Sequence, residues 1–274
     1  MSIEERVLKA EELTRTTYKL RALLSSPSSG SGKTTSSITV PGKRKLVIDL
    51  DNRSECIAGE EGVEIVKPWK SDPDSPDAWD EVVAIKNELW SIARAAAKAG
   101  KPYPYDLIVG DGISGALRIC MNWCLIIPDN EGRIKTGLGG TPAQHHYFPQ
   151  MWNITKLIRS TLGLPCHVVW TGHENKVTEN EGNINCWLPK ITGKLDTEVA
   201  TWFNETYYCY KEEGKGEKTK FFWLTSHNAL RPYLKSSLNK RELFWSDPIQ
   251  IDFNSPPVGF EYLLEKRFGP EKVV

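Results

Sequence analysis

A short glycine-rich run, Gly30-Ser31-Gly32-Lys33-Thr34, holds the residues best suited to chemistry in this sequence. Binding a phosphate chain requires converging backbone N–H groups at the start of a helix, a lysine for the outer phosphate oxygens and a hydroxyl for Mg²⁺. The run supplies these in order, although Pro27 stands where the full G-x-x-x-x-G-K-[ST] pattern has its first glycine. It therefore predicts a nucleotide site (a P-loop) with Mg²⁺, rather than an ordinary Gly/Ser-rich surface loop. The predicted binding residues are Ser29, Gly30, Ser31, Gly32, Lys33, Thr34 and Thr35.

A P-loop also needs a carboxylate for Mg²⁺, placed at the end of a buried strand. Asp111 closes the apolar run DLIVGD, so Asp111 and Thr34 are the predicted metal ligands. The alternative for Asp111 is a cap of the following helix. Many AAA-type ATPases have a catalytic glutamate directly after this aspartate, but here Gly112 follows it. The carboxylate that activates water must therefore come from elsewhere in the chain.

Two acidic residues at the end of the strand pattern KLVIDL, Asp49 within it and Asp51 just after it, are the candidates for that carboxylate. Asp51 lies just past the strand end, where ligands bind in open α/β sheets, so it is predicted to orient the attacking water. Asp49 is predicted to be buried support, and a turn or cap role for both residues stays open. His173 follows the apolar run HVVWT-Gly172 and could sense the γ-phosphate, unless it is a structural histidine. The predicted catalytic residues are Lys33, Asp51 and His173.

The elements that must position these residues alternate between strands and helices. Apolar runs predict strands at 19–25, 45–50, 64–66, 106–109 and 167–171, and helical spacing predicts helices at 2–15, 78–99, 113–124 and 151–162. Residues 206–210 and 220–224 predict antiparallel strands, after a short helix near 197–203. Gly, Pro and charged residues predict irregular loops at 128–149 and 174–194. The expected fold class is α/β, a mainly parallel sheet with antiparallel edge strands at the C-terminal side.

The P-loop, VIDLD, DLIVGD and VVWTGHE occur in this order, and together they resemble the RecA-like recombinase ATPase core. The strings TGHE at 171–174 and PKITGKL at 189–195 also resemble the phage-encoded RecA-like ATPases implicated in single-strand annealing. The resemblance covers residues 18–253, which leaves a helix at 1–17 as a possible oligomerisation element and a tail at 254–274. In this resemblance Asp51 matches the catalytic acid, usually a glutamate, and His173 matches the γ-phosphate-sensing position.

The resemblance also implies cofactors and partners. The cofactors are ATP and Mg²⁺, and the partners are single-stranded DNA, further copies of the chain in a ring or filament, and a single-strand binding protein. The resemblance implies that the protein acts in DNA recombination, annealing or replication.

RecA-like proteins bind single strands with two loops, whose equivalents here are 128–149 and 174–194. The predicted DNA contacts mix cations with aromatic rings, as base-stacking surfaces do: Arg133, Lys135, His145, His146, Lys176, Trp187 and Lys190. The alternative is that both segments are ordinary solvated loops. Lys240 and Arg241 could reach the ATP of a neighbouring subunit, and a solvated basic pair is the alternative for them.

The composition limits the other possibilities. The 274 residues carry 35 Lys+Arg and 35 Asp+Glu, which excludes a protein that coats nucleic acid through bulk charge. No stretch approaches the ~18–20 apolar residues that span a bilayer. Six scattered cysteines without a CxxC pair favour a reducing, cytoplasmic location.

Three other functions compete with ATP hydrolysis. A GTPase is disfavoured because Asn175-Lys176-Val177-Thr178 lacks the aspartate of the N-K-x-D pattern. A small-molecule phosphotransferase is disfavoured because the segment 128–149 holds a single arginine. A scaffold that binds nucleotide with negligible turnover stays open.

Overall fold

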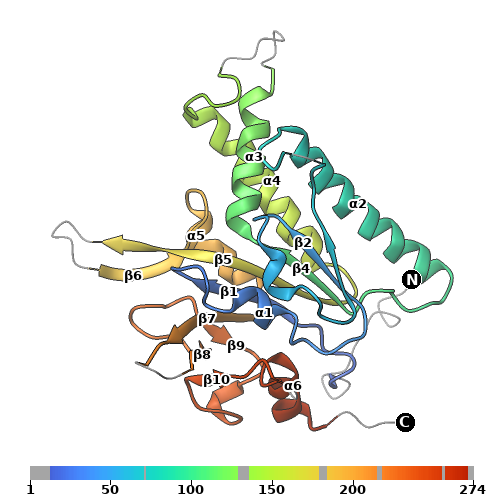
Figure 1. Cartoon of the computed structure of the whole chain (residues 1–274), viewed down its shortest axis with the longest axis vertical. Coiled ribbons are helices and arrows are strands. Elements are labelled where there is room, and N and C mark those ends of the chain that lie inside the picture. Colours follow the sequence, from blue (N-terminus) through green and yellow to red (C-terminus); the bar gives the residue numbers. More distant parts are fainter. Residues whose placement is uncertain are drawn as a thin grey trace, which may run out of the picture.

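A mainly parallel sheet forms the centre of the computed structural model, which describes residues 13–70, 72–128, 136–178, 184–214, 218–254 and 257–270 (Figure 1). Its strands are β1 (Arg21–Ser26), β2 (Lys45–Asp49), β3 (Val63–Val66), β4 (Leu107–Asp111), β5 (His167–Thr178), β7 (Glu205–Glu212), β8 (Lys220–Leu224) and β10 (Ile249–Ile251). Their order is β10-β8-β7-β1-β5-β4-β2-β3. Strands β7 to β3 run parallel, whereas β8 and β10 extend the β7 edge in antiparallel pairs. The predicted α/β class is confirmed.

Helices cover both faces of this sheet. On one face lie α2 (Asp77–Lys98), α3 (Ile113–Ile126) and α4 (Gln144–Leu162), and on the other lie α1 (Lys33–Ser37) and α6 (Phe260–Phe268). The short elements are η3 (Ser54–Ile57), α5 (Leu195–Glu198), η4 (Val199–Trp202), η5 (Lys240–Glu242) and two further strands, β6 (Ile184–Pro189) on β5 and β9 (Lys235–Ser236) on β7. Among the described residues, no helix is both long and apolar enough to cross a membrane.

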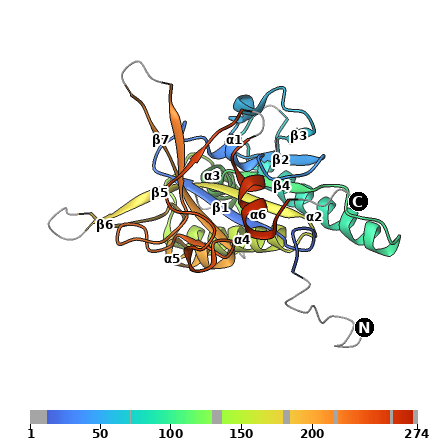
Figure 2. The ribbon, with the colours of Figure 1, turned by 90° about the horizontal axis from the view of Figure 1, so that it is seen from below.

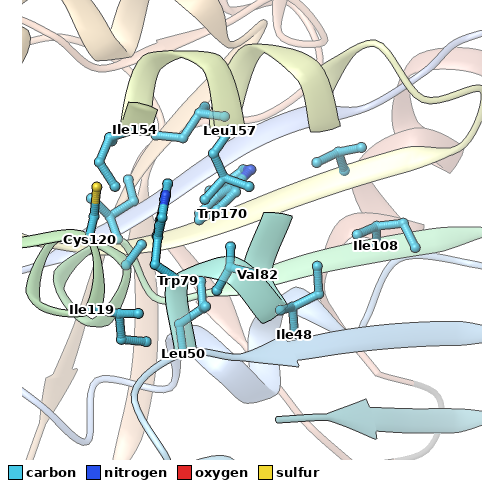
Figure 3. Packing of buried hydrophobic residues seen from close by; sticks show 14 of the residues in the cluster. Ile48, Leu50, Trp79, Val82, Ile108, Ile119, Cys120, Ile154, Leu157 and Trp170 are labelled. Atoms are coloured by element: carbon cyan, nitrogen blue, oxygen red, sulfur yellow. The ribbon is translucent and has the colours of Figure 1, made fainter. Parts of the chain in front are cut away.

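Alternation along the central strands divides the core into two clusters. Leu23 and Ile108 pack with α2, α3 and α4, while their neighbours Leu24 and Val109 pack with α6 on the opposite face. Figure 3 shows the first cluster, in which Trp79 and Ile154 lie close to Trp170 of β5. The two clusters hold the strands whose ends carry the candidate residues.

Helix α4 begins earlier than the sequence pattern predicts. It starts at Gln144 rather than Met151, so the last six residues of the predicted loop 128–149 are helical. His146 stabilises this start, because its Nδ1 accepts a hydrogen bond from the backbone N–H of Ala143 at 2.9 Å. Pro149 lies inside the helix. Proline has no backbone N–H to donate within a helix and usually breaks one, so its presence made the sequence of this segment resemble a loop.

The predicted loop 174–194 is largely a β-hairpin. Strand β5 continues to Thr178, and β6 pairs with it in antiparallel register, with Lys176 opposite Trp187. Figures 1 and 2 both show the hairpin extending away from the body of the protein. Sequence pattern missed this pairing because the segment is polar and its two strands are stabilised by contacts with Arg231, far along the chain.

The two ends of the described chain contact each other. The predicted helix 2–15 lies mostly outside the described residues, and from Leu13 onwards the backbone forms a turn rather than a helix. Arg15 makes ion pairs with Glu261 at 3.3 Å and Glu265 at 3.5 Å, both on α6. Phe260 and Leu264 of α6 are fully buried. The predicted tail 254–274 therefore includes a helix that belongs to the hydrophobic core.

Candidate functional site

The predicted site residues meet at the C-terminal ends of four neighbouring strands. In the parallel pair β1–β5, Ser26 lies opposite His173. In the pair β2–β4, Asp49 lies opposite Asp111. Because β5 and β4 are also adjacent, the P-loop that follows β1 lies beside the acidic ends of β4 and β2. This is the edge of an open α/β sheet where ligands bind.

The P-loop joins β1 to α1 with the backbone that its glycines predict. Gly30 and Gly32 have φ of +71° and +79°, a left-handed conformation that residues with a side chain rarely adopt. Lys33 Nζ donates hydrogen bonds to the Ser28 carbonyl oxygen at 3.1 Å and to Ser31 Oγ at 3.2 Å. Burial lowers the pKa of Lys33, and neighbouring carboxylates oppose this change. The ammonium group is held inside the loop, where reduced hydration strengthens its attraction for phosphate oxygens.

Thr34 and Asp111 form the candidate magnesium site. Thr34 Oγ1 donates a hydrogen bond to Asp111 Oδ2 at 2.9 Å, and the Thr171 hydroxyl donates to the other carboxylate oxygen. Asp111 is 4% exposed; this burial raises the pKa of its carboxyl group, while the two threonine hydrogen bonds act in the opposite direction. Hydroxyl and carboxylate oxygens suit Mg²⁺. No group of three or more His, Cys, Asp or Glu that could hold a metal occurs in the described part of the chain, so phosphate and water oxygens would have to complete the shell.

The two aspartates at the end of β2, Asp49 within it and Asp51 just after it, have different environments. Asp49 is fully buried and accepts hydrogen bonds from Ser54 Oγ at 2.6 Å and the Arg53 backbone N–H at 3.1 Å, which matches the predicted structural role. Asp51 lines the cavity beside the P-loop instead. Its carboxylate lies against the first turn of α3, where a Cβ atom on Gly115 would come within 2.5 Å of Asp51 Oδ1. Asp51 is therefore the better-placed carboxylate for a water near the phosphates.

His173 lies on β5, next to the end of β1. Its Nδ1 is 3.3 Å from the Ser26 carbonyl oxygen. Burial lowers the pKa of His173, and the Lys33 ammonium lowers it further. The imidazole is consequently neutral near pH 7 and carries one N–H: on Nδ1 it is donated to the Ser26 carbonyl oxygen, and on Nε2 it can be donated to a phosphate oxygen.

Glu174, the next residue, connects this position to more distant parts of the chain. Glu174 is 4% exposed and forms an ion pair with Arg231, with Arg231 Nε 2.9 Å from Glu174 Oε1. The Tyr233 hydroxyl hydrogen-bonds to both Glu174 and Ser25 of β1. Arg231 also stacks over the ring of Tyr208, 3.5 Å from its centroid. The pattern of the sequence gave no sign of this network, because its members lie on separate elements.

The candidate residues line one cavity of about 410 Å³. Sequence reasoning missed several of its lining residues, namely Arg53, Cys56, Thr171, Gly172, Phe221 and Phe253. The two phenylalanines come from β8 and the segment after β10, about 190 residues or more beyond the P-loop in the chain, so no local pattern marks them. A larger cavity, of about 770 Å³, lies near Lys43, Asp106 and His167, at the opposite ends of the strands. It lacks Lys33, Thr34 and Asp111, so the smaller cavity is the chemically competent one.

The predicted DNA contacts have mixed placements. His145, Lys176 and Lys190 are exposed, and Trp187 is partly exposed on the hairpin. His146 is 5% exposed and bonded to the start of α4, so its prediction as a DNA contact is wrong. Arg133 and Lys135 lie outside the described residues. Lys240 and Arg241 are exposed on η5 and do not line the cavity, so their role toward a neighbouring subunit stays a prediction.

Comparison with known proteins agrees with this geometry. The profile of the AAA domain family matches residues 19–230, a segment that runs from β1 past β8 and includes the P-loop, Asp51, Asp111 and His173. No curated protein matches the chain. The matched segment covers well over half of the sequence. The chain therefore belongs to the AAA domain family, and its P-loop is a nucleotide-binding site of the NTPase type.

Proposed function

We propose that this protein binds and hydrolyses ATP with Mg²⁺ and, as a homo-oligomer, acts on single-stranded DNA in recombination, annealing or replication. The observation that carries the enzymatic part is the convergence of Lys33, Thr34, Asp111, Asp51 and His173 on one cavity. Each supplies a function that phosphoryl transfer to water requires, and they come from four adjacent strand ends.

The roles follow from the atoms that line the cavity. Lys33 binds the β- and γ-phosphate oxygens, and Thr34 with Asp111 holds Mg²⁺, which supplies charge stabilisation for the phosphates. Asp51 orients the attacking water and accepts its proton. His173 contacts the γ-phosphate, so loss of this group on hydrolysis removes a contact made by β5.

Exposed side chains on α4 support the nucleic-acid part of the proposal. His145, Phe148, Trp152, Lys156 and Arg159 recur every three or four residues and are all exposed; we call them the outer face of α4. Phe148 and Trp152 are 73% and 65% exposed. The 19 residues of α4 include no Asp or Glu. Exposed aromatic rings beside cations on a helix without carboxylates suit stacked bases and a phosphate backbone.

The outer face of α4 is connected to the second candidate DNA surface, the β5–β6 hairpin. Gln150 is buried within α4, donates to the Leu117 carbonyl oxygen of α3 at 2.8 Å, and accepts from Thr192 Oγ1 at 2.8 Å, just after β6. On the hairpin, Lys176 Nζ lies 5.5 Å from the centroid of the Trp187 ring. Both surfaces therefore present a cation with an aromatic ring, and side-chain hydrogen bonds join their supporting elements.

Hydrolysis is tested by measuring phosphate release from Mg-ATP with and without single-stranded DNA. We expect turnover that rises when DNA is added, and we expect Lys33→Ala to lose both nucleotide binding and turnover. Lys98→Ala, at the exposed end of α2, is the matched control and should behave as wild type. A rate that falls or stays constant with DNA would contradict the coupling of the two sites.

The scaffold alternative predicts a different pattern in the same set of proteins. Strand annealing that survives Lys33→Ala intact, together with negligible turnover by the wild type, would favour a nucleotide-binding scaffold over an ATPase.

DNA binding by the outer face of α4 is tested with Phe148→Ala/Trp152→Ala. Stacking contributes ~1–3 kcal/mol per base, so the two changes should weaken binding to single-stranded DNA by about 30-fold or more. Leu243→Ala is the matched control, because Leu243 is exposed to 73%, the same fraction as Phe148. Lys156→Ala/Arg159→Ala should reduce the slope of log affinity against log salt by about 1.4. Equal DNA affinity in all these variants would exclude this surface.

A further inference from the structure

We propose that Phe221 and Phe253 form a subsite for the base of the bound nucleotide. The inference rests on the proposed ATP site and deepens it, because it assigns the part of the ligand that the P-loop, Mg²⁺ ligands and Asp51 leave without a partner. Both rings line the same cavity as the P-loop.

The two rings lie directly against the P-loop. A Cβ atom on Gly32 would be 3.0 Å from Phe221 Cδ1 and 3.0 Å from Phe253 Cζ, so the loop backbone touches both side chains. Their ring centroids are 5.1 Å apart and the ring planes are inclined at 57°. Two inclined rings form a corner that offers one face for stacking and one edge for contact with a planar group.

Neither ring is fully buried in the hydrophobic core. Phe221 and Phe253 are partly exposed and pack only at the margin of the cluster around Phe260. The next residue of β8, Phe222, points to the other face of the sheet and stacks on Tyr210 at 5.2 Å. Phe221 therefore leaves an apolar surface facing the nucleotide cavity.

There is also space for a nucleoside beside the rings. The same two phenylalanines line an adjoining cavity of about 560 Å³, with Lys220, Gln250 and Asn254. A phosphate chain held by Lys33 and Thr34 can therefore continue past Thr35 toward the rings, and the base can stack there. The subsite recognises a π-face, which every nucleobase has.

The test compares Mg-ATP with inorganic tripolyphosphate, which carries the phosphates without a base. Binding of each ligand is measured by titration calorimetry for wild type, Phe221→Leu, Phe253→Leu and Phe222→Leu. Leucine keeps most of the apolar volume, and a urea unfolding curve for each variant verifies that it folds. Phe222→Leu is the matched control on the same strand.

We expect the dissociation constant for Mg-ATP to rise about 5- to 150-fold in Phe221→Leu and Phe253→Leu, because a stacked base contributes ~1–3 kcal/mol. Tripolyphosphate affinity should stay unchanged in both variants, and Phe222→Leu should bind both ligands as wild type does. Equal losses for the two ligands, or no loss for ATP, would overturn the base subsite. A wild type that binds neither ligand would instead overturn the proposed ATP site itself.

Discussion

Replacing Gly115 by alanine is expected to displace Asp51 and so to slow ATP hydrolysis without abolishing nucleotide binding. Gly115 lies in the first turn of α3, where an added Cβ would be 2.0 Å from the Leu50 carbonyl oxygen and 2.5 Å from Asp51 Oδ1. Ordinary contact begins near 3.4 Å. The clashing Leu50 oxygen is a backbone atom just after β2 and cannot rotate away as a side chain could. Either this backbone or α3 must therefore move by more than about 1 Å.

The size of the effect follows from this displacement. A misplacement of ~1 Å at a catalytic group costs about 100-fold in rate, so we expect kcat to fall by roughly that factor. Overpacking costs ~1–3 kcal/mol of stability, and the better helix propensity of alanine returns about 1 kcal/mol, so the net loss should be below about 2 kcal/mol. The dissociation constant for Mg-ATP should change little, because Lys33 and Thr34 are untouched.

The assay combines steady-state hydrolysis, calorimetric binding of Mg-ATP and urea unfolding. Gly172→Ala is the matched control, since it lines the same cavity and its Cβ would meet its nearest neighbour, Ile113 Cδ1, at an ordinary 3.6 Å. That variant should keep wild-type kcat and stability. If Gly115→Ala hydrolyses ATP within about twofold of Gly172→Ala, the position of Asp51 does not govern the reaction and the reasoning fails.

Two further predictions concern titration and access. Burial lowers the pKa of His167 to about 4, so the unfolded chain takes up this proton first as pH falls. Stability is therefore lost between about pH 6.5 and pH 4, and the loss attributable to His167 is about 2 kcal/mol at pH 5 relative to pH 7.5. In His167→Asn the side chain can still accept a hydrogen bond from the Leu20 backbone N–H. Its free energy of unfolding, measured with urea, should therefore fall by about 2 kcal/mol less than that of the wild type between pH 7.5 and pH 5. An equal fall in the variant and the wild type would disprove the assignment. Cys56 is an exposed residue that lines the nucleotide cavity, and partial burial of its sulfur atom raises the pKa of the thiol. Alkylation by iodoacetamide should be slow at pH 7, accelerate toward pH 9, and be blocked by Mg-ATP, as read by peptide mass spectrometry. Unchanged labelling in saturating Mg-ATP would place the nucleotide elsewhere.

Local patterns were sufficient for the residues that follow a strand directly. Asp111 and His173 each come at the end of an apolar run, so strand prediction placed them at one edge of the sheet, and the glycine-rich pattern after the first strand placed Lys33 beside them. The prediction of His146 as a DNA contact was wrong because Pro149 made the start of α4 resemble a loop. The side chain was therefore expected to be exposed, whereas it caps the helix. Tertiary structure overrode the local signal at that point.

Contacts between distant segments were beyond the reach of such patterns. Phe221 and Phe253 touch Gly32 only because β8 and β10 fold back against the P-loop edge. Arg231 determines the surroundings of Glu174 in the same way. In each case the deciding partner is far away in sequence and carries no signal of its own.

Strand β5 is one continuous element that connects the nucleotide site to the β5–β6 hairpin. It starts at His167 between β1 and β4, reaches the cavity at His173 and ends at Thr178 in the hairpin. At ~3.3 Å per residue, the arm from His173 to Thr178 is about 17 Å long. A tilt of about 5° at His173 would therefore shift Thr178 by about 1.5 Å, a displacement comparable to the radius of an atom. If the hairpin contacts DNA as proposed, a small displacement of His173 at the phosphate would be carried along this arm to the bound strand, and the Glu174–Arg231 ion pair holds the arm near His173.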